Sequence, residues 1–266
     1  MNVFNFLHTY QPQPILVKLG PISIYWYGML IVAGFCLGAY VAFKLAKKYD
    51  FRTESLWSLA FYVLIFGLVG ARLYHVLCEL PYYLKNPVQI LKIWQGGLAI
   101  WGAIIGAVLV FFFYARRYRR SYLALWDIVV PGLALGQAIG RWGNWFNQEL
   151  FGRPVAWGIP IKLTNRPEIY QNFTHFHPVF LYESIWCFLI FLILMLAHKK
   201  IGAPSSDYSR GRIFALYLIL YSLGRFFIEL IRIDPQPIFF GLRAGQLMSI
   251  VLFVAGWTIF IRTLEH

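Results

Sequence analysis

Charged residues are scarce in this sequence, and acidic residues are the scarcest. Only 13% of the 266 residues are Asp, Glu, Lys or Arg, and eleven residues are acidic. Soluble domains carry roughly 25% charged residues, and a chain with 59% hydrophobic residues would expose apolar patches in water. The composition therefore excludes an ordinary soluble domain and predicts an integral membrane protein embedded in a lipid bilayer.

Cysteine is also rare, and its placement gives no sign of a disulfide framework. Cys36, Cys78 and Cys187 are odd in number and lie in or beside apolar runs, so we interpret them as small buried hydrophobic residues. The pair His175 and His177 has the spacing of a metal-site fragment, but no third ligand is in register. No metal site is predicted.

The formal net charge of +13 does not predict a nucleic-acid partner. The cations occur in short clusters between apolar runs, which is typical of membrane topology signals. The sequence has no basic face or known module that would bind nucleic acid.

Seven apolar runs are long enough to cross a bilayer as helices. We predict membrane spans at residues 22–46, 55–78, 97–115, 124–141, 178–197, 212–232 and 244–262. Residues 79–96 are expected to form a loop, and residues 142–177 a small extracytoplasmic subdomain between helices four and five. The predicted fold is therefore an all-α polytopic membrane protein, with seven transmembrane helices in a single domain over residues 1–266.

Small residues four apart predict which helix faces pack closely. Gly102 and Gly106 lie in the third predicted span, and Gly132, Gly136 and Gly140 lie in the fourth. Glycines at this spacing share one helix face and let two backbones approach each other. We therefore expect both spans to contact neighbouring helices through these glycines.

The distribution of Lys and Arg predicts the orientation. Three connectors and the tail together hold thirteen of them: Lys44, Lys47, Lys48, Arg52, Arg116, Arg117, Arg119, Arg120, Lys199, Lys200, Arg210, Arg212 and Arg262. The opposite side holds nine, spread over longer loops. The positive-inside rule then predicts an outer N-terminus and a cytoplasmic C-terminus.

This topology brings polar residues from distant segments to a similar depth near the outer face. The densest group is residues 140–153, GRWGNWFNQELFGR. Arg225, Glu229 and Arg232 follow at i, i+4 and i+7, which puts them on one helix face. The other residues expected at this depth are Tyr27, Arg72, His75, His177, Tyr182, Glu183, Gly245 and Gln246.

The chemistry that this group suggests is anion binding. Arginine stays charged, and its planar fork matches a phosphate. We expect a carboxylate to hold each guanidinium, with Glu149 near Arg141 and Glu229 near Arg225. The alternative is a set of ion pairs that only joins helices, but two Arg–Glu pairs with Asn and His at one level favour a binding site.

At these residues the sequence resembles the bacterial prolipoprotein diacylglyceryl transferase family. GRWGNWFNQELFGR is similar to the family signature GR-x-GN-x-x-N-x-E-x-x-G. Other elements that resemble the family, in the same order along the chain, are GPISIYWYGML, GARLYHVL, WQGGLAIWGAIIG, HPVFLYES, GRFFIELIR and GLRAGQLMSI. The resemblance covers nearly the whole chain, and several independent motifs make it specific.

The resemblance implies an enzyme of the bacterial cytoplasmic (inner) membrane with its active site near the outer face. It would move the diacylglyceryl group of phosphatidylglycerol to the lipobox cysteine of preprolipoproteins, form a thioether and release glycerol phosphate, the first step of lipoprotein maturation. The implied catalytic residues are Tyr27, Arg141, Asn144, Glu149, Arg225 and Glu229. The implied substrate-binding residues are Arg141, Arg72, Gly152, His177, Arg225 and Arg232. No cofactor or metal is expected, because displacement at an alkyl carbon next to phosphate requires none.

One departure from the family pattern leaves the thiol base open. Trp101 stands where many family members have His, and an indole cannot accept a proton from a thiol. The base is then His177, Tyr27, His75 or Glu149, or the thiolate forms in the field of the arginines alone.

Two other function classes stay open. The first is a lipid-binding relative without activity, which the Trp101 departure motivates. The second is a transporter, which predicts internal repeats and charges distributed across the membrane. We find no convincing repeat, and the charges gather on one side.

Overall fold

The computed structural model describes residues 3–20, 22–47, 53–201 and 211–264. The chain divides into two compact units, Met1–Ala42 with Asp127–His266, and Phe43–Trp126, and each unit is described by itself. Three of the cations that predict the orientation, Lys48, Arg52 and Arg210, lie outside the described residues.

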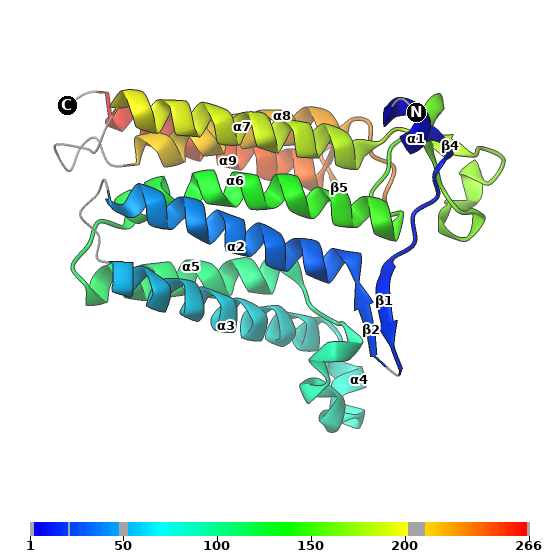
Figure 1. Cartoon of the computed structure of the whole chain (residues 1–266), viewed down its shortest axis with the longest axis horizontal. Helices are drawn as coiled ribbons and strands as arrows, with labels where there is room; N and C mark the ends of the chain where they lie inside the picture. The colour runs from blue at the N-terminus through cyan, green and yellow to red at the C-terminus, as the bar shows by residue number, and fades with distance from the viewer. Residues whose placement is uncertain (1–2, 21, 48–52, 202–210, 265–266) are drawn as a thin grey trace. The chain divides into compact units, whose positions relative to one another are not determined.

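The first unit contains five long helices that run side by side (Figure 1). They are α2 (Trp26–Ala46) and α6 (Tyr122–Asn147), each of which also contributes one end to the second unit, and α7 (Val179–Ile201), α8 (Arg212–Glu229) and α9 (Ala244–Arg262). The short elements of this unit are α1 (Val3–Thr9), the 3₁₀ turns η4 (Leu163–Asn165) and η5 (Glu168–Tyr170), and three antiparallel strand pairs. The pairs are β1 (Ile15–Leu19) with β2 (Ile22–Tyr25), β3 (Pro154–Pro160) with β4 (His175–Phe176), and β5 (Ile238–Phe239) with β6 (Leu242–Arg243).

The second unit is built on the antiparallel helices α3 (Thr53–Cys78) and α5 (Ile100–Arg117). The segment between them was expected to be a loop, and this expectation is wrong. It contains the short helix α4 (Leu80–Lys85) and the 3₁₀ turns η2 (Pro87–Leu91) and η3 (Ile93–Gln95).

Within the described residues, six helices are long and apolar enough to cross a membrane, namely α2, α3 from Leu56, α5, α6, α7 and α9. The sixth predicted span, residues 212–232, corresponds to α8, which is not among them because its 18 residues include Arg212, Arg225 and Glu229. A count of seven spans is therefore not confirmed. Six such helices indicate a multi-pass membrane protein.

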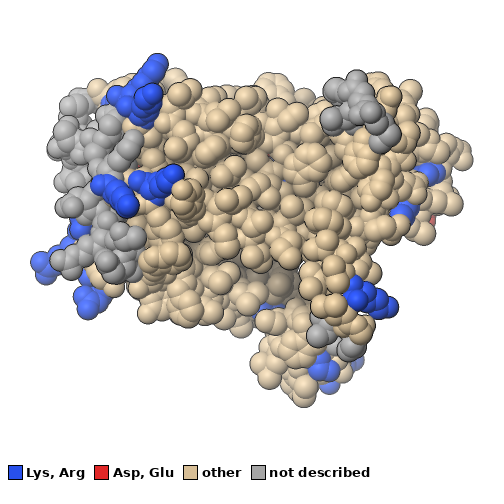
Figure 2. Space-filling view, viewed as in Figure 1, with Lys and Arg blue, Asp and Glu red and all other residues tan. Residues whose placement is uncertain are grey.

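The flanks of the long helices are apolar and largely exposed in the isolated chain. On the face shown in Figure 2, Lys and Arg gather near helix ends and joining segments, and the helix flanks show none. Cys36 and Cys78 lie exposed, so the expectation that they are buried is wrong, whereas Cys187 is buried. Lipid tails are as apolar as a protein interior, so a small hydrophobic residue needs no burial within the protein there.

The glycine spacing predicted close helix contacts correctly for four of the five glycines, whereas Gly140 meets only the Ile31 side chain. Gly132 and Gly136 of α6 lie against glycines of α2, and Gly102 and Gly106 of α5 lie against the backbone of α3. At Gly132, Gly102 and Gly106 an added Cβ would overlap the facing backbone. These glycines therefore allow the helix axes to come close.

A buried carboxylate fixes the position of α8 against α6. Asp127 of α6 accepts hydrogen bonds from the backbone N–H groups of Gly211 (2.6 Å) and Phe214 (2.8 Å), at the first turn of α8. The His198 ring of α7 is 2.8 Å from the Asp127 carbonyl oxygen. Because the first N–H groups of a helix lack partners within it, this contact stabilises the end of α8.

Helix α6 does not end at residue 141 as predicted but continues to Asn147. Trp142, Trp145 and Phe146 lie at i, i+3 and i+4 and pack on an apolar core beyond the long helices. The buried residues of this core are Leu7, Trp145, Phe151, Ile159, Ile161, Phe176 and Phe180, from α1, α6, α7, the β3–β4 pair and the chain between them. Burial of this face explains why the helix extends through the polar signature.

Candidate functional site

A cluster of seven charged side chains lies in the first unit where α6, α7, α8 and α9 meet. Its members, which we call the ionic cluster, are Arg141, Arg225, Arg232, Arg243, Glu183, Glu229 and Asp234. They carry four positive and three negative formal charges. Such a group is expensive inside a membrane protein unless its members pair with one another or serve a function.

Glu183 of α7 joins two of the arginines. Its Oε2 atom is 2.5 Å from Nε of Arg141 on α6, and its Oε1 atom is 2.5 Å from Nη1 of Arg225 on α8. Arg232 Nη1 lies 3.5 Å from the same Oε1 atom. Only 6% of the Glu183 side chain is exposed, so this carboxylate is a buried counter-ion shared by Arg141, Arg225 and Arg232.

Glu229 of α8 is fully buried and forms the second centre of the ionic cluster. Its Oε1 atom accepts a hydrogen bond from Arg225, as the i, i+4 spacing predicted. Its Oε2 atom is 3.0 Å from Arg243 Nε, without the alignment of a hydrogen bond. Gly245, at the start of α9, leaves room for this side chain, because a Cβ there would overlap the carboxylate.

Asp234 anchors the segment that follows α8. Its carboxylate accepts hydrogen bonds from Arg232 Nε (2.7 Å) and Gln236 Nε2 (2.9 Å), and Arg243 Nη2 donates to its carbonyl oxygen (2.7 Å). Burial alone would raise the pKa of Asp234, but these hydrogen bonds and the charges of Arg232 and Arg243 outweigh burial and lower it. The carboxylate is therefore ionised at neutral pH.

A second polar network follows Arg141 along the signature. Arg141 Nη1 donates to Asn144 Oδ1 (3.4 Å), and Asn144 Nδ2 donates to Glu149 Oε1 (2.8 Å). Glu149 was expected to pair directly with Arg141, but Glu183 takes this place and Asn144 separates the two. Because α6 runs on to Asn147, Glu149 lies beyond the helix end, whereas Glu183 faces Arg141 from the next helix.

The backbone around Glu149 is held in an uncommon conformation. Gln148 and Leu150, on either side of it, have φ values of 53° and 55°, in the left-handed region that residues other than glycine rarely occupy. The Gln148 side chain accepts a hydrogen bond from Lys162 N (2.8 Å) and helps to hold this turn. Backbone strain of this kind clusters at functional sites.

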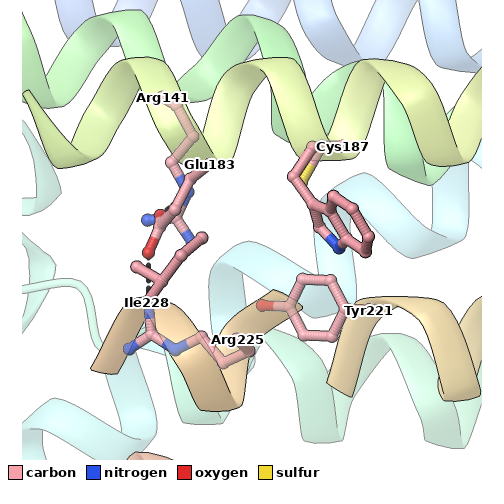
Figure 3. A pocket seen from close by; sticks show the side chains of 7 residues that line it. Arg141, Glu183, Cys187, Tyr221, Arg225 and Ile228 are labelled. Atoms are coloured by element: carbon pink, nitrogen blue, oxygen red, sulfur yellow. Dashed lines mark hydrogen bonds and ion pairs between the residues drawn. The ribbon is translucent and has the colours of Figure 1, made fainter. Parts of the chain in front are cut away.

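The ionic cluster borders a small pocket between α6, α7 and α8 (Figure 3). The pocket is small, with about 10 Å³ of space for a water-sized molecule, and it is partly open to the outside. Its lining residues are Arg141, Glu183, Trp186, Cys187, Tyr221, Arg225 and Ile228. Its walls thus place two guanidinium groups, which can bind an anion, next to aromatic and apolar side chains.

Tyr27 lies beside the signature helix. Its ring packs on Gly143 of α6, where an added Cβ would overlap ring atoms. Gly143 is therefore required for the close approach of Tyr27 to α6, at the residue just before Asn144.

Gly152 and His177 lie next to each other beside the segment that follows α8, and neither belongs to the ionic cluster. Gly152 N donates to the His177 carbonyl oxygen (3.1 Å), and a Cβ on Gly152 would overlap Ile231 and His177. The His177 ring shares a hydrogen bond with Tyr182 Oη (3.0 Å). Partial burial lowers the pKa of His177, so its ring is neutral at pH 7 and does not add a positive charge.

Arg72 belongs to the second unit, and its contacts are with backbone. Its guanidinium donates to the carbonyl oxygens of Gln89 (2.5 Å), Ile90 (2.9 Å), Gly96 (2.8 Å) and Gly97 (2.9 Å). These four hydrogen bonds organise residues 79–99, which contain no long helix. The contacts therefore support a positioning role for Arg72.

Arg72→Lys is expected to loosen residues 79–99 although the charge is kept. A single ammonium cannot reach four carbonyl oxygens, and a hydrogen bond from a charged group contributes about 1.5–3 kcal/mol. We expect a lower melting temperature in detergent and faster proteolysis within residues 79–99. Arg116→Lys, an exposed site on α5 of the same unit, is the control. Equal proteolysis of both variants would contradict the role of Arg72.

The sequence did not identify three members of the site. Glu183 was expected at the same depth as the arginines but was not recognised as the bridge between them, and Asp234 and Arg243 were given no role. Their partners are set by tertiary packing, with Glu183 and Arg225 42 residues apart. A signal was available for Arg243, because it lies within GLRAGQLMSI.

A family model described as prolipoprotein diacylglyceryl transferase matches residues 14–262. A relative from Thermotoga petrophila is 43% identical over 92% of this chain and 83% of its own length. One from Parasynechococcus marenigrum is 40% identical over 92% and 91%, and one from Staphylococcus xylosus 39% identical over 94% and 88%. All three are named phosphatidylglycerol–prolipoprotein diacylglyceryl transferase. Since the matched residues include the whole ionic cluster and all six candidate spans, the chain belongs to the prolipoprotein diacylglyceryl transferase family.

Proposed function

We propose that the protein transfers the diacylglyceryl group of phosphatidylglycerol to the lipobox cysteine thiol of preprolipoproteins. The observation that carries the proposal is the pair Arg141 and Arg225, held by one carboxylate at the rim of one pocket. The names of the relatives, at 39–43% identity over most of both chains, support the same reaction.

In the proposed reaction, a C–S bond forms between the cysteine sulfur and the terminal glycerol carbon of the diacylglyceryl group. The C–O bond from that carbon to the phosphate breaks, and glycerol phosphate leaves with the bonding electron pair. Arg141 and Arg225 bind the phosphate and stabilise the negative charge that grows on it. Glu183 and Glu229 keep the two guanidinium groups in place before the lipid arrives.

The thiol proton goes to a base near Arg141, and we assign this role to Glu149. We call Arg141 and Arg225 the phosphate clamp. The exposed carboxylate of Glu149 is connected to Arg141 through Asn144, so the base and the phosphate clamp belong to one hydrogen-bond network. Nearby cations favour the thiolate. Trp101 of α5 is half exposed and its indole takes no proton, so it has no part in this step.

The remaining predicted residues support the site. Tyr27 packs against the signature helix beside Asn144, and Arg232 ties Glu183 to Asp234. Gly152 and His177 join the signature to the segment after α8 and the start of α7. Arg72 acts on residues 79–99, away from the phosphate clamp in the sequence and in a different unit.

We also propose the topology: seven spans with α8 as the sixth, in the bacterial inner membrane, with the N-terminus outside. Residues 142–177 then form an extracytoplasmic subdomain. Helix α8 packs against α7 and α9, and its Arg225 and Glu229 side chains form ion pairs within the ionic cluster. Because these charges are paired inside the protein, α8 can cross the membrane although it is less apolar than the other spans. Reporter fusions after Lys47, Arg120 and Arg262 should all be cytoplasmic, and a fusion after Arg166 extracytoplasmic.

The direct test of the function uses the purified protein in vesicles that contain phosphatidylglycerol and a lipobox peptide. We expect a peptide product heavier by one diacylglyceryl group, in a thioether that alkaline hydroxylamine does not cleave. A peptide with Ser in place of Cys is the control. If the protein binds phosphatidylglycerol but forms no product, it is a lipid-binding relative without activity, the alternative that Trp101 motivates. The transporter alternative is tested by measuring solute flux across the vesicle membrane.

Gly143→Ala is expected to lower kcat roughly tenfold or more, since small misplacements of a catalytic group cost this much. The added methyl group would overlap Tyr27 and push its ring away. Gly28→Ala is the matched control, because a Cβ at Gly28 of α2 meets no atom within 4 Å. Equal transferase rates in the two variants would show that the position of Tyr27 does not matter.

A further inference from the structure

We propose that residues 79–99 form an interfacial anchor, whose apolar side chains lie at the boundary between head groups and acyl chains. In this anchor, Lys85 and Lys92 contact anionic lipid head groups. The proposal depends on the membrane-spanning helices and not on the proposed transferase reaction.

The position of the segment in the chain puts it at a membrane surface. It starts after Cys78, the last residue of α3, and ends before Ile100, the first residue of α5. Both helices are candidate spans, so the 21 residues that join them must lie just outside the hydrocarbon core. The segment is folded there into α4, η2 and η3 rather than extended into water.

The outer surface of this segment is apolar and has no protein partner among the described residues of its own unit. Leu84 is 74% exposed, and Leu91 and Trp94 are each 75% exposed. The adjoining ends of the two helices also expose apolar side chains, with Leu77 on α3 and Ile100 on α5 each 68% exposed. Exposed large apolar side chains gathered in one segment mark an interaction site, and the candidate membrane spans at both ends of the segment favour the bilayer as its occupant.

The internal hydrogen bonds of the segment favour contact with lipid over contact with a water-soluble protein. Irregular backbone near hydrocarbon needs partners for its carbonyl groups from within the protein, because water does not reach them. Arg72, 7% exposed, supplies them for four carbonyl groups of residues 89–97, and its guanidinium lies over the buried ring of Tyr83, 5.2 Å from the centroid. Four carbonyl groups of the segment thus have a hydrogen-bond donor within the protein, and the exposed side chains Leu84, Leu91 and Trp94 are apolar.

The charges of the segment fit an anionic surface. Lys85 and Lys92 are its two cations, and Glu79 is its one acidic residue. Lysine can place its stem along an apolar surface and its ammonium among head groups, and tryptophan and tyrosine are enriched at that depth. Trp94 and the half-exposed Tyr82 match this pattern.

The test places an environment-sensitive fluorescent amino acid at position 91, and separately at position 94, in the full-length protein reconstituted in vesicles. Thr164, exposed in η4, is the control position. At positions 91 and 94 we expect strong quenching by lipids with a nitroxide near the ester carbonyl and weak quenching by iodide. At position 164 we expect the opposite. Iodide quenching at positions 91 and 94 equal to that at 164 would overturn the proposal, and so would shielding from both quenchers, which would indicate cover by protein.

The lysine contacts are tested with the same fluorophore. In vesicles that mix phosphatidylcholine with phosphatidylserine, an anionic nitroxide lipid should quench position 91 more than a zwitterionic one does. Lys85→Gln with Lys92→Gln should abolish this preference, whereas Lys162→Gln, which lies outside the segment, should retain it. A preference that persists in the double variant would exclude the two lysines as the lipid contacts. Phosphatidylserine is used so that recognition of the donor lipid does not enter the result.

Discussion

Replacing Arg141 or Arg225 by Ala is expected to lower kcat for diacylglyceryl transfer by about 10²–10³-fold. The two guanidinium groups contact the two oxygens of Glu183 and line the same pocket. Either substitution therefore removes one half of the phosphate clamp. The loss should appear mainly in kcat, because the phosphate gains negative charge only as the C–O bond breaks.

Both arginine variants are expected to remain folded, since no carboxylate of the ionic cluster is left without a partner. Without Arg225, Glu183 keeps Arg141 at 2.5 Å and Glu229 keeps Arg243 at 3.0 Å. Without Arg141, Glu183 keeps Arg225 at 2.5 Å. The loss of stability should thus stay below the roughly 3–5 kcal/mol that an orphaned buried charge costs.

The control is Arg153→Ala, an exposed arginine of the same signature. Rates of thioether formation and melting temperatures in detergent are measured for all three variants. Near-normal kcat for Arg141→Ala and Arg225→Ala would remove the phosphate clamp from the mechanism. A loss of activity that matches a loss of folded protein would assign these arginines to stability instead.

Local patterns in the sequence predicted the parts of the fold that depend on local structure. Apolar runs predicted six of the spans, and the spacing of Arg225 and Glu229 predicted their contact. The end of α6 was missed because Gly143 and the polar signature residues lower the hydropathy there. The period of Trp142 and Trp145 would have indicated a continuing helix.

The partner of Arg141 could not be predicted in the same way. Several acidic residues were expected at one depth, and which of them faces Arg141 depends on how α6 and α7 are rotated about their axes. The sequence does not contain that rotation in any local pattern. The contacts of Arg72 could not be predicted for a related reason, because its partners are backbone carbonyls that carry no sequence signal.

Glu183→Gln is expected to lower kcat about 10²-fold through misplacement of the two arginines. The amide keeps the shape of the side chain but removes the negative charge that Arg141 and Arg225 share. The two guanidinium groups then repel each other, and the ionic cluster gains one net positive charge. Glu183→Asp, which keeps the charge, should restore part of the rate.

A split between KM and kcat separates positioning from stability in this variant. The phosphate of the donor lipid supplies the negative charge that Glu183→Gln removes, so KM for phosphatidylglycerol should stay level or fall while kcat drops. Glu229→Gln is the comparison, because Glu229 also contacts Arg225 but does not line the pocket. Its carboxylate is fully buried beside Arg225 and Arg243, so the amide should mainly destabilise the protein. A rise in KM for phosphatidylglycerol in Glu183→Gln, with kcat unchanged, would contradict the positioning role. Glu183 would then contribute to binding of the donor lipid instead of holding Arg141 and Arg225 in place.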